Sequence, residues 1–342
     1  MCIVRAGGHL PTMPFSTTQL EPLLDHLAPQ LATVADHDWH GWRVRRINGG
    51  MNNIVLRATN DDADFAIKFT RRDARNRARR EFDALRLLHT LPMPLAPAPV
   101  HFDDARYAQP VVVQTWLAGE VRAEPPRTRD EWQKLIDHLV SIHEVALEHA
   151  ARFAIALVNA NLSPSSPRAL AELAREVTDA MPDNARSAAM RDVLRLLGRS
   201  KLSDAAGPAR LIRCDANTLN FIRRDDGWRS VDWENSGWGD PAFEMGEMMT
   251  HPKYLDVDEA TWHWFIEAYC AATGETVTRI RAYRAAMLAW WAATCERNLW
   301  LNDADAHGRL VQRPADWREH VRRLHEHYCA AAIAVLNNDL GR

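Results

Sequence analysis

The sequence predicts an α+β chain with two lobes: a small antiparallel β-sheet carrying one helix, followed by a larger, mainly helical lobe. Short stretches that alternate apolar and polar residues, separated by turn residues, occupy the chain between residues 42 and 116. Long stretches with apolar residues at helical spacing occupy most of the chain after residue 118. The 342 residues are enough for two lobes, each with its own core.

We expect three segments along the chain. Residues 1–30 form an N-terminal leader rich in glycine and proline and then a short helix, whose apolar face is made by the leucines of Leu20–Leu27. Residues 31–117 form the sheet lobe, and residues 118–342 form the helical lobe.

Five strands are expected in the sheet lobe. A tight turn with two glycines joins the first two strands, and an Asn-Asp-Asp turn joins the second to the third. The strands lie at residues 42–47, 54–58, 64–69, 100–102 and 110–116.

A strongly basic helix is expected at Arg71–Leu88, between the third and fourth strands. Its first half holds six arginines, and its second half has an apolar face that includes Phe82, Leu85 and Leu88. A basic run can contact nucleic acid, but the whole chain has a net charge of −3 and no aromatic residues alternate with these arginines. We therefore expect the arginines to form a solvated face of the helix.

The helical lobe begins with a capping box at Thr128-Arg129-Asp130-Glu131, which opens a helix that runs to about Leu147. Gly239-Asp240-Pro241 marks another helix start, with Asp240 as N-cap and Pro241 at the first position. Further helices are expected at residues 167–179, 184–199, 257–272, 276–301 and 315–337.

A polar segment interrupts the apolar pattern between the second and third of these helices. Leu211–Ile222 is expected to form a strand, an exposed loop that carries Asp215 and Asn220, and a second strand. A hairpin turn at Gly227 then leads to Val231-Asp232-Trp233, where an acid ends an apolar strand. A buried carboxylate is costly unless it is paired or holds a metal. Three oxygen-bearing side chains at one end of a small antiparallel sheet therefore predict a magnesium site.

Composition narrows the function classes. The 42 basic and 45 acidic residues nearly balance, which does not predict a nucleic-acid partner. Five scattered cysteines form no CxxC pair, and we expect reduced thiols in a cytoplasmic protein. No apolar run approaches the roughly 20 residues of a membrane span, so we expect no membrane partner.

Lys68 on the third strand and Glu81 on the following helix complete a set of charged groups with Asp215, Asn220 and Asp232. Phosphoryl transfer needs a cover over the phosphates, a cation on them, an acid that orients the cation, magnesium ligands, and an acid near the attacking hydroxyl. In this order of parts the sequence resembles the aminoglycoside phosphotransferase and choline kinase family, which has a bilobal protein-kinase-like fold. The resemblance spans about residues 40–330. The matching pieces are Gly49-Gly50-Met51-Asn52-Asn53, Ile67-Lys68, Arg80-Glu81, Ile142-His143, Arg213-Cys214-Asp215 through Asn220, Val231-Asp232-Trp233-Glu234 and Gly239-Asp240-Pro241.

The resemblance implies a role for each of these residues. Lys68 would hold the α- and β-phosphates of ATP, and Glu81 would orient Lys68. Asp215 would accept or position the hydroxyl of the substrate, while Asn220 and Asp232 would hold Mg²⁺. The remaining nucleotide contacts would come from the covering turn, with Gly49, Gly50, Asn52 and Asn53, and from the connector that includes Gln114 and Trp116.

The acceptor pocket is less specified, and two kinds of residue compete for it. Trp290 and Trp291 would suit a choline-like ammonium group because aromatic faces bind cations, although tryptophans on such helices more often pack in the core. Carboxylates would suit an aminoglycoside, and the candidates are Asp240, Glu244, Glu296 and Asp303, of which Asp240 also reads as a helix cap.

Only seven residues separate Asp232 from Asp240, which is too short to dock and switch a peptide substrate. We therefore expect an ATP- and Mg²⁺-dependent kinase that phosphorylates a hydroxyl of a small, cationic molecule, such as an aminoglycoside-like antibiotic or a choline-like amino alcohol. Arg213 stands where the family usually has histidine. This departure motivates the alternative, a catalytically quiet kinase-like protein that only binds nucleotide.

Overall fold

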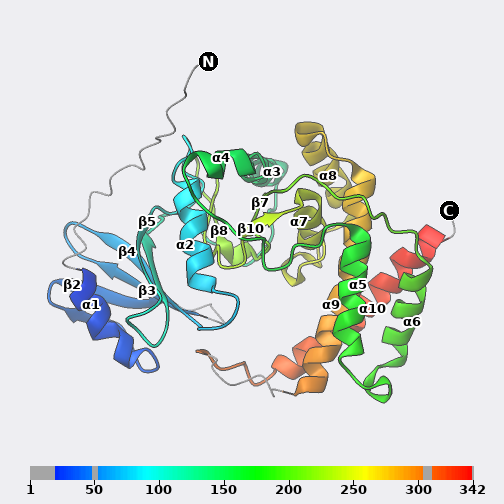
Figure 1. The fold of residues 1–342 in the computed structure, drawn as a ribbon, viewed down its shortest axis with the longest axis horizontal. Coiled ribbons are helices and arrows are strands. Elements are labelled where there is room, and N and C mark those ends of the chain that lie inside the picture. Colours follow the sequence, from blue (N-terminus) through cyan, green and yellow to red (C-terminus); the bar gives the residue numbers. More distant parts are fainter. Residues whose placement is uncertain (1–19, 48–52, 303–309, 341–342) are drawn as a thin grey trace.

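The computed structural model describes residues 20–47, 53–302 and 310–340 (Figure 1). A six-stranded antiparallel sheet lies at one end of the molecule, and helices make up most of the rest. The predicted mixed α+β fold class is therefore confirmed.

The sheet has the strand order β1-β2-β3-β4-β6-β5, with β4 near its middle. All five predicted strands are present. The sixth, β1, is a three-residue edge strand that is too short to show an alternating pattern in the sequence. The strands are β1 (His37–Trp39), β2 (Trp42–Ile47), β3 (Asn53–Thr59), β4 (Asp64–Thr70), β5 (Pro99–Asp103) and β6 (Val111–Thr115).

One helix covers each face of this sheet. The leucines of α1 (Leu20–Leu27) share a buried cluster with Val44, Ile54 and Phe65, which confirms the short helix expected before the sheet. On the opposite face, α2 (Arg77–Leu88) packs its apolar side against Val112. Packing in these two clusters fixes the position of β4, which carries Lys68, relative to α2.

Helix α2 begins six residues later than the sequence predicted. Its N-cap residue, Asn76, has a left-handed backbone with φ of 50°, and residues 71–76 form the loop before it. Arginine favours helices, so the pattern did not reveal that Arg72 binds carbonyls between β5 and β6 and that Arg75 contacts Asn235 of the second lobe.

The long helices of the second lobe match the expected positions closely. Thr128 caps α3 through its side chain, as the capping box predicted, and Asp240 caps α7 with Pro241 in its first turn. The short α4 was not predicted, and α6 starts late because a 3₁₀ turn (Asp183–Ala185) precedes it. The helices are α3 (Arg129–His143), α4 (Leu147–Arg152), α5 (Pro167–Asp179), α6 (Ala188–Arg199), α7 (Pro241–Met248), α8 (Glu259–Thr273), α9 (Val277–Leu301) and α10 (Trp317–Leu340), with further 3₁₀ turns at Ala28–Gln30, Thr218–Asn220 and Pro252–Tyr254.

The small strands around the polar segment pair differently from the prediction. The single hairpin sheet that we expected is replaced by two separate ladders: β7 (Arg210–Ile212) pairs with β10 (Gly237–Gly239), and β8 (Phe221–Ile222) pairs with β9 (Arg229–Ser230). The loop with Asp215 and the segment with Asp232 are thereby held between two ladders rather than at the end of one.

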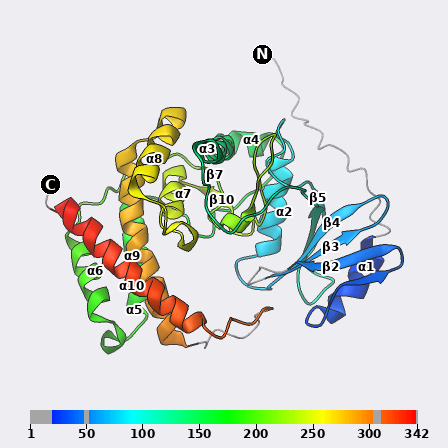
Figure 2. The same cartoon turned by 180° about the vertical axis from the view of Figure 1, so that it is seen from behind.

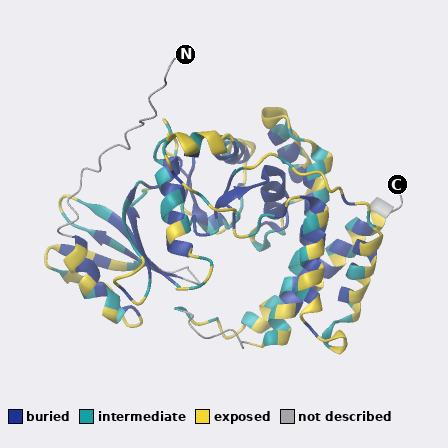
Figure 3. Ribbon diagram, viewed as in Figure 1, coloured by how far each residue is buried: buried dark blue, intermediate teal, exposed yellow. Residues whose placement is uncertain are grey.

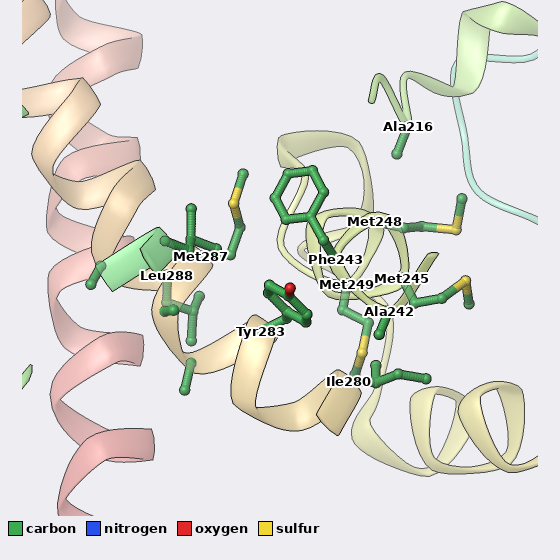
Figure 4. Packing of buried hydrophobic residues seen from close by; sticks show 14 of the residues in the cluster. Ala216, Ala242, Phe243, Met245, Met248, Met249, Ile280, Tyr283, Met287 and Leu288 are labelled. Carbon is green, nitrogen blue, oxygen red and sulfur yellow. The ribbon is translucent and has the colours of Figure 1, made fainter. Parts of the chain in front are cut away.

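Helix α7 is the buried centre of the helical lobe, and every one of its residues is buried (Figure 3). Phe243 of α7 meets Tyr283 of α9 edge-on, with ring centroids 5.9 Å apart (Figure 4). Gly246 lets the two helices approach closely, because a Cβ at this position would lie 2.8 Å from the Cβ of Tyr283. Seen from behind, α10 crosses the outer side of α9 (Figure 2). None of the described helices combines the length and apolar character needed to cross a membrane.

Candidate active site

Lys68 joins the sheet to the polar segment of the second lobe. It lies on β4, and its side chain is buried. Its Nζ donates to Glu81 Oε2 at 2.7 Å and to Asp232 Oδ1, and it lies 3.6 Å from Glu234 Oε2. The structure therefore brings together three residues that the sequence predicted to act in one site, Lys68, Glu81 and Asp232.

The charges in this cluster stabilise one another. Burial alone would lower the pKa of Lys68, but the negative charges of Asp232, Glu81 and Glu234 more than compensate, and its pKa is raised. Burial raises the pKa of Glu81 to about 7 although Lys68 opposes the shift. The lysine is thus firmly cationic, as a group that binds phosphates must be.

Glu234 is a central residue to which the sequence analysis gave no role. It is buried, and it accepts from Asn53 Nδ2 at 2.7 Å and from Arg77 Nη1 at 2.6 Å. Burial would raise its pKa, but Lys68 and Arg77 hold the pKa of this carboxyl below its usual value. Glu234 therefore remains ionised and connects the start of β3, the start of α2 and Lys68. The sequence signal for Glu234 was its place two residues after Asp232, but the residues that Glu234 contacts lie more than 150 residues away in the sequence.

Asp232 has an unusual backbone, with φ of 64°. The residue before it is held on both sides: the Val231 N–H donates to the Asn220 carbonyl at 2.9 Å, and the Val231 carbonyl accepts from Arg213 Nη2 at 3.0 Å. Left-handed backbone in a non-glycine residue is uncommon and persists where the surroundings enforce it. These contacts direct the Asp232 carboxylate toward Lys68.

Asp215 lies close enough to the other acids to affect them. Its Oδ1 accepts from the Asn217 N–H at 3.0 Å. Burial raises its pKa, while the positive charge of Arg213 opposes the rise. Burial raises the pKa of Asp232, and the positive charge of Lys68 opposes this rise. Repulsion from Glu234 and then from Asp215 raises the pKa further.

Arg213 fills the position that the resemblance assigns to histidine, and it is a core residue. Its side chain is 1% exposed and lies over the rings of Phe221 and Trp233, with centroids 4.6 and 5.4 Å from the guanidinium carbon. Its Nη2 reaches the Val231 carbonyl. The arginine therefore joins the loop of Asp215 to the segment of Asp232, as a hydrogen-bonding residue at this position needs to do.

Glu244 supports the loop of Asp215 through hydrogen bonds to the loop backbone. Its Oε1 accepts from the backbone N–H groups of Arg213 and Cys214 at 2.8 and 2.9 Å, and its Oε2 lies 2.7 Å from His143 Nε2. The side chain is 2% exposed. The acceptor-binding role predicted for Glu244 is not supported by this position, because both carboxylate oxygens are used inside the protein.

A second buried acid on α7, Glu247, lies one turn further along. The Ala216 backbone N–H donates to it, while its Oε2 has no hydrogen-bond partner in the described part of the chain. Burial, followed by repulsion from Asp215 and Glu244, raises its pKa well above the usual range. The loop of Asp215 therefore rests on two acids with opposite preferences, one ionised and one neutral.

The predicted nucleotide cover is only partly visible. Gly49, Gly50 and Asn52 lie outside the described residues. Asn53, at the start of β3, is buried and donates to Glu234, so the end of the glycine turn is tied to the second lobe.

The predicted connector lies at the end of β6. The Trp116 backbone N–H donates to the Asp64 carbonyl at 2.8 Å, so this group is not free to bind adenine. The guanidinium of Arg57 covers the Trp116 ring at 4.5 Å. The Gln114 side chain is buried, and its Oε1 has no partner among the described residues.

The other acidic acceptor candidates are also used internally. Asp240 caps α7 through Oδ1, while its Oδ2 accepts from Tyr283 at 2.7 Å and pairs with Arg279. Glu296 Oε1 accepts from the Ser187 N–H at 2.7 Å, at the start of α6. Asp303 lies outside the described residues. Buried and paired carboxylates of this kind do not line an open pocket.

The tryptophan candidates pack on the helical core. Trp291 stacks on Tyr328 of α10, with centroids 5.6 Å apart and planes at 12°. Trp290 meets Trp291 edge-on at 5.2 Å, and both contact the main hydrophobic cluster. The structure thus favours the core alternative that the sequence left open for them.

The arginine run at 71–80 was expected to be a solvated face. Arg72 and Arg79 are exposed as expected, but Arg75, Arg77 and Arg80 contact the second lobe. Arg77 is 5% exposed and pairs with Glu234 and Asp73. Arg75 contacts the side chain of Asn235, and Arg80 donates to the Ser236 carbonyl at 2.8 Å. The run contacts the segment after Asp232, and a sequence pattern cannot show that another lobe covers it.

The residues present suit a magnesium ion bound together with phosphates. Among the described residues, no group of three or more His, Cys, Asp or Glu side chains is arranged to hold a metal by itself. Mg²⁺, however, usually takes one or two protein carboxylates and completes its shell with waters and phosphates. Asp232 supplies a partly exposed carboxylate, and the amide nitrogen of buried Asn220 has no hydrogen-bond partner within the described ranges.

The sequence between residues 43 and 283 matches a family model described as the phosphotransferase enzyme family. None of the curated proteins compared with the chain matches it.

Solved structures show the same fold at low sequence identity. A candidate aminoglycoside phosphotransferase from Ralstonia eutropha JMP134 superposes with a TM-score of 0.68 and 14% identity, covering 95% of this chain and 99% of that one. A choline/ethanolamine kinase family protein from Mesorhizobium loti gives 0.62 and 18%, covering 92% and 95%. A spectinomycin phosphotransferase, solved with ADP and spectinomycin, gives 0.58 and 15%, covering 94% and 99%.

Proposed function

Because this chain belongs to the phosphotransferase enzyme family, we propose that it transfers the γ-phosphoryl group of ATP, with Mg²⁺, to a hydroxyl group of a small molecule. The observation that carries the proposal is the contact of Lys68 with both Glu81 and Asp232. It supports the proposal because a cation, the acid proposed to orient it and the proposed magnesium ligand belong to one hydrogen-bonded group, near Asp215.

Each residue has one task in this proposal. Lys68 binds the phosphates of ATP, and Glu81 keeps its ammonium group in place. Asp215 accepts or positions the proton of the attacking hydroxyl, and Asp232 with Asn220 holds the metal. The bound Mg²⁺ would neutralise charge on the phosphates. Phosphoryl transfer depends mainly on positioning and electrostatic stabilisation, which fixed side chains of this kind supply.

The short segment after Asp232 supports a small acceptor, whereas the acidic residues do not specify the charge of that acceptor. The seven residues between Asp232 and Asp240 include strand β10 and leave no long segment for docking a peptide. A cationic acceptor was expected from Asp240, Glu244 and Glu296, but these carboxylates are buried and paired. Amino alcohols and aminoglycosides therefore remain test acceptors beside neutral and anionic ones.

The alternative, a quiet nucleotide-binding protein, rested on Arg213. The arginine makes a hydrogen bond to the Val231 carbonyl and opposes the rise in the pKa of Asp215. Both effects favour an active site, so the described geometry gives the alternative no specific support.

The test is a screen of ATP consumption with hydroxyl-bearing metabolites and antibiotics, in the presence and absence of Mg²⁺. Asp215→Ala should abolish transfer while ATP affinity stays nearly unchanged, and Lys68→Ala should weaken nucleotide binding. ATP binding without phosphorylation of any acceptor would favour the quiet alternative. Full turnover by Asp215→Ala would remove Asp215 from its assigned role.

A further inference from the structure

Arg75 and Arg80 both lie near the start of α2, and neither has a carboxylate partner among the described residues; Arg72, which also has none there, binds backbone carbonyls of the sheet lobe. Arg75 precedes α2, and Arg80 lies in its first turn. Arg77, between them, takes both carboxylates of this region, Asp73 at 3.0 Å and Glu234 at 2.6 Å. Arg75 and Arg80 therefore form no direct ion pair at this end of the helix, although Glu234 and Asp73 partly offset the charge of Arg75 from a distance.

The contacts that these two arginines do make are with neutral oxygens. Arg75 Nη2 donates to the Asn235 side chain. Arg80 Nη1 donates to the backbone carbonyls of Asn159 and Ser236. The Nε–H of each arginine is buried and lacks a partner in the described part of the chain. A buried donor that is left unsatisfied costs free energy, and one on a charged group costs more.

The two side chains lie close enough to repel one another. Burial, and then the charge of Arg77, lowers the pKa of Arg75. Burial, and then the charge of Arg75, lowers the pKa of Arg80. A nearby anion would reverse both effects, since an opposite charge favours the ionised form.

The helix itself adds positive potential at this place. The first turn of α2 contains no acidic residue, and Asn76 provides no side-chain cap. Helix N-termini bind anions through free N–H groups and the helix dipole, so acidic residues usually occupy the first turn. Here arginines occupy it instead.

The site lies at the junction of the two lobes, beside the catalytic segments. Arg75 contacts Asn235, three residues after Asp232, and Arg80 contacts Ser236, just before β10. Both arginines also lie near Cys214, the neighbour of Asp215. Helix α2 and β10 lie side by side in both views of the fold (Figures 1 and 2).

We propose that Arg75, Arg80 and the N-terminus of α2 bind an oxyanion, a phosphate or carboxylate group, at this junction. The group is either part of the acceptor or a free phosphate ion, and the two share the same chemistry. Guanidinium groups suit both because they pair with oxyanions through parallel hydrogen bonds. The site goes beyond the proposed function, since binding there requires no phosphoryl transfer.

The first experiment is a calorimetric titration of the full chain with inorganic phosphate, with Mg²⁺ and a non-hydrolysable ATP analogue present to fill the nucleotide site. The double variant Arg75→Gln, Arg80→Gln should bind phosphate at least about tenfold more weakly, because each arginine supplies a charged hydrogen bond. Arg75→Lys, Arg80→Lys, which keeps the charge, should retain part of the affinity. This second variant keeps the test valid if the glutamine variant folds poorly.

The matched control is Arg79→Gln, Arg86→Gln, which removes two charges from the same helix. Arg79 lies over the Phe102 ring and Arg86 pairs with Asp83, so neither belongs to the site. Phosphate affinity should be unchanged in this control. Equal phosphate binding by the wild type and Arg75→Gln, Arg80→Gln, or an equal loss in the control, would overturn the proposal.

The second experiment identifies the source of the anion. Hydroxyl compounds that carry a phosphate or carboxylate are compared with neutral counterparts as acceptors. An acceptor-borne group predicts that Arg75→Gln, Arg80→Gln lowers kcat/KM about tenfold for the anionic acceptors alone, whereas a free phosphate ion predicts an equal effect on all acceptors. Failure of the ATP analogue to bind would count against the proposed function, and phosphate titration would still report on the anion site.

Discussion

Glu244 accepts hydrogen bonds from two backbone N–H groups just before Asp215, so removing its carboxylate should deform the loop that carries Asp215. Glu244→Ala leaves these two donors and His143 Nε2 without their partner, and we expect the free energy of unfolding to fall by about 3 kcal/mol. Urea denaturation measures this loss. We also expect kcat to fall at least tenfold.

The same substitution separates a supporting role from acceptor binding. Loss of an acceptor contact would raise KM for the acceptor and leave stability nearly unchanged. Glu247→Gln is the matched control on α7, since this acid is already held in its neutral form, and we expect little change in stability.

His138 makes folding sensitive to acid. It is buried, with Nε2 3.0 Å from Ser230 Oγ, and burial followed by the charge of Arg213 lowers its pKa to about 3. The unfolded chain binds a proton near pH 6.5, whereas the folded protein does not until about pH 3. This contribution to stability is therefore complete above pH 6.5 and is lost as the pH falls, by about 1.4 kcal/mol per pH unit.

The measurement is chemical denaturation at pH 7 and pH 5. His138→Gln should lose less stability between the two values than the wild type, whatever it costs at pH 7. The same substitution at His263, which is exposed on α8, should leave the slope unchanged. Equal slopes for wild type and His138→Gln would contradict the assignment.

At the scale of elements, α7 and α9 approach through Gly246. A Cβ there would lie 2.8 Å from the Cβ of Tyr283 and 2.9 Å from the Arg284 backbone nitrogen, so the two helices would have to separate. We expect Gly246→Ala to lower the free energy of unfolding by about 1–3 kcal/mol, as overpacking does. Thermal or urea denaturation gives the value.

Gly198 offers the opposite case on α6. Its nearest contact would be the end of the flexible Arg175 side chain at 3.0 Å, and the residue is exposed. Alanine should therefore stabilise the protein by about 0.5–1 kcal/mol through helix propensity. A neutral or stabilising effect of Gly246→Ala would contradict the close approach of α7 and α9.

The elements themselves were largely predictable because their signals are local. Thr128 and Asp240 cap helices as their residue types suggest, and the alternating strands of the sheet lie where the pattern placed them. The pairing of β7 with β10 was not predictable, because the two strands are short and lie about 25 residues apart. The late start of α2 was missed for a related reason: the arginines before the helix bind distant partners, Arg72 the segment between β5 and β6 and Arg75 the side chain of Asn235.

At the scale of the whole molecule, a few buried polar contacts join the two lobes. Asn53, Lys68 and Arg77 reach Asp232 or Glu234 from the sheet lobe. A nucleotide bound on Lys68 adds to this junction, so Mg²⁺ with a non-hydrolysable ATP analogue should stabilise the whole chain. The expected gain is about 2.7 kcal/mol at one hundred times the dissociation constant.

Differential scanning calorimetry with and without Mg²⁺ measures this gain. Lys68→Ala should show a much smaller one at the same ligand concentration. An equal gain in this variant would place the nucleotide away from Lys68.

The candidate site was predictable only where residue type and order carried the information. Lys68, Glu81 and Asp232 were expected together and lie together. Glu234 and Glu244 are held by partners that are distant in the sequence. Glu244 was predicted to bind the acceptor because a sequence does not show which acids are buried. The charge of Arg75 and Arg80 was visible in the sequence, but only the fold shows that neither forms an ion pair with a carboxylate of the described residues.

The bonds to Glu244 also impose an order on folding. The loop before Asp215 takes its final shape only when α7 is in place, and His143, which shares the carboxylate, is 101 residues away in the sequence. Long-range contacts form late because they require large loops to close. Refolding can be followed both by the helical circular-dichroism signal and by the recovery of enzymatic turnover. The two should give different rates, with turnover recovering more slowly. A newly made chain therefore acquires its activity only after α7 has been synthesised and docked.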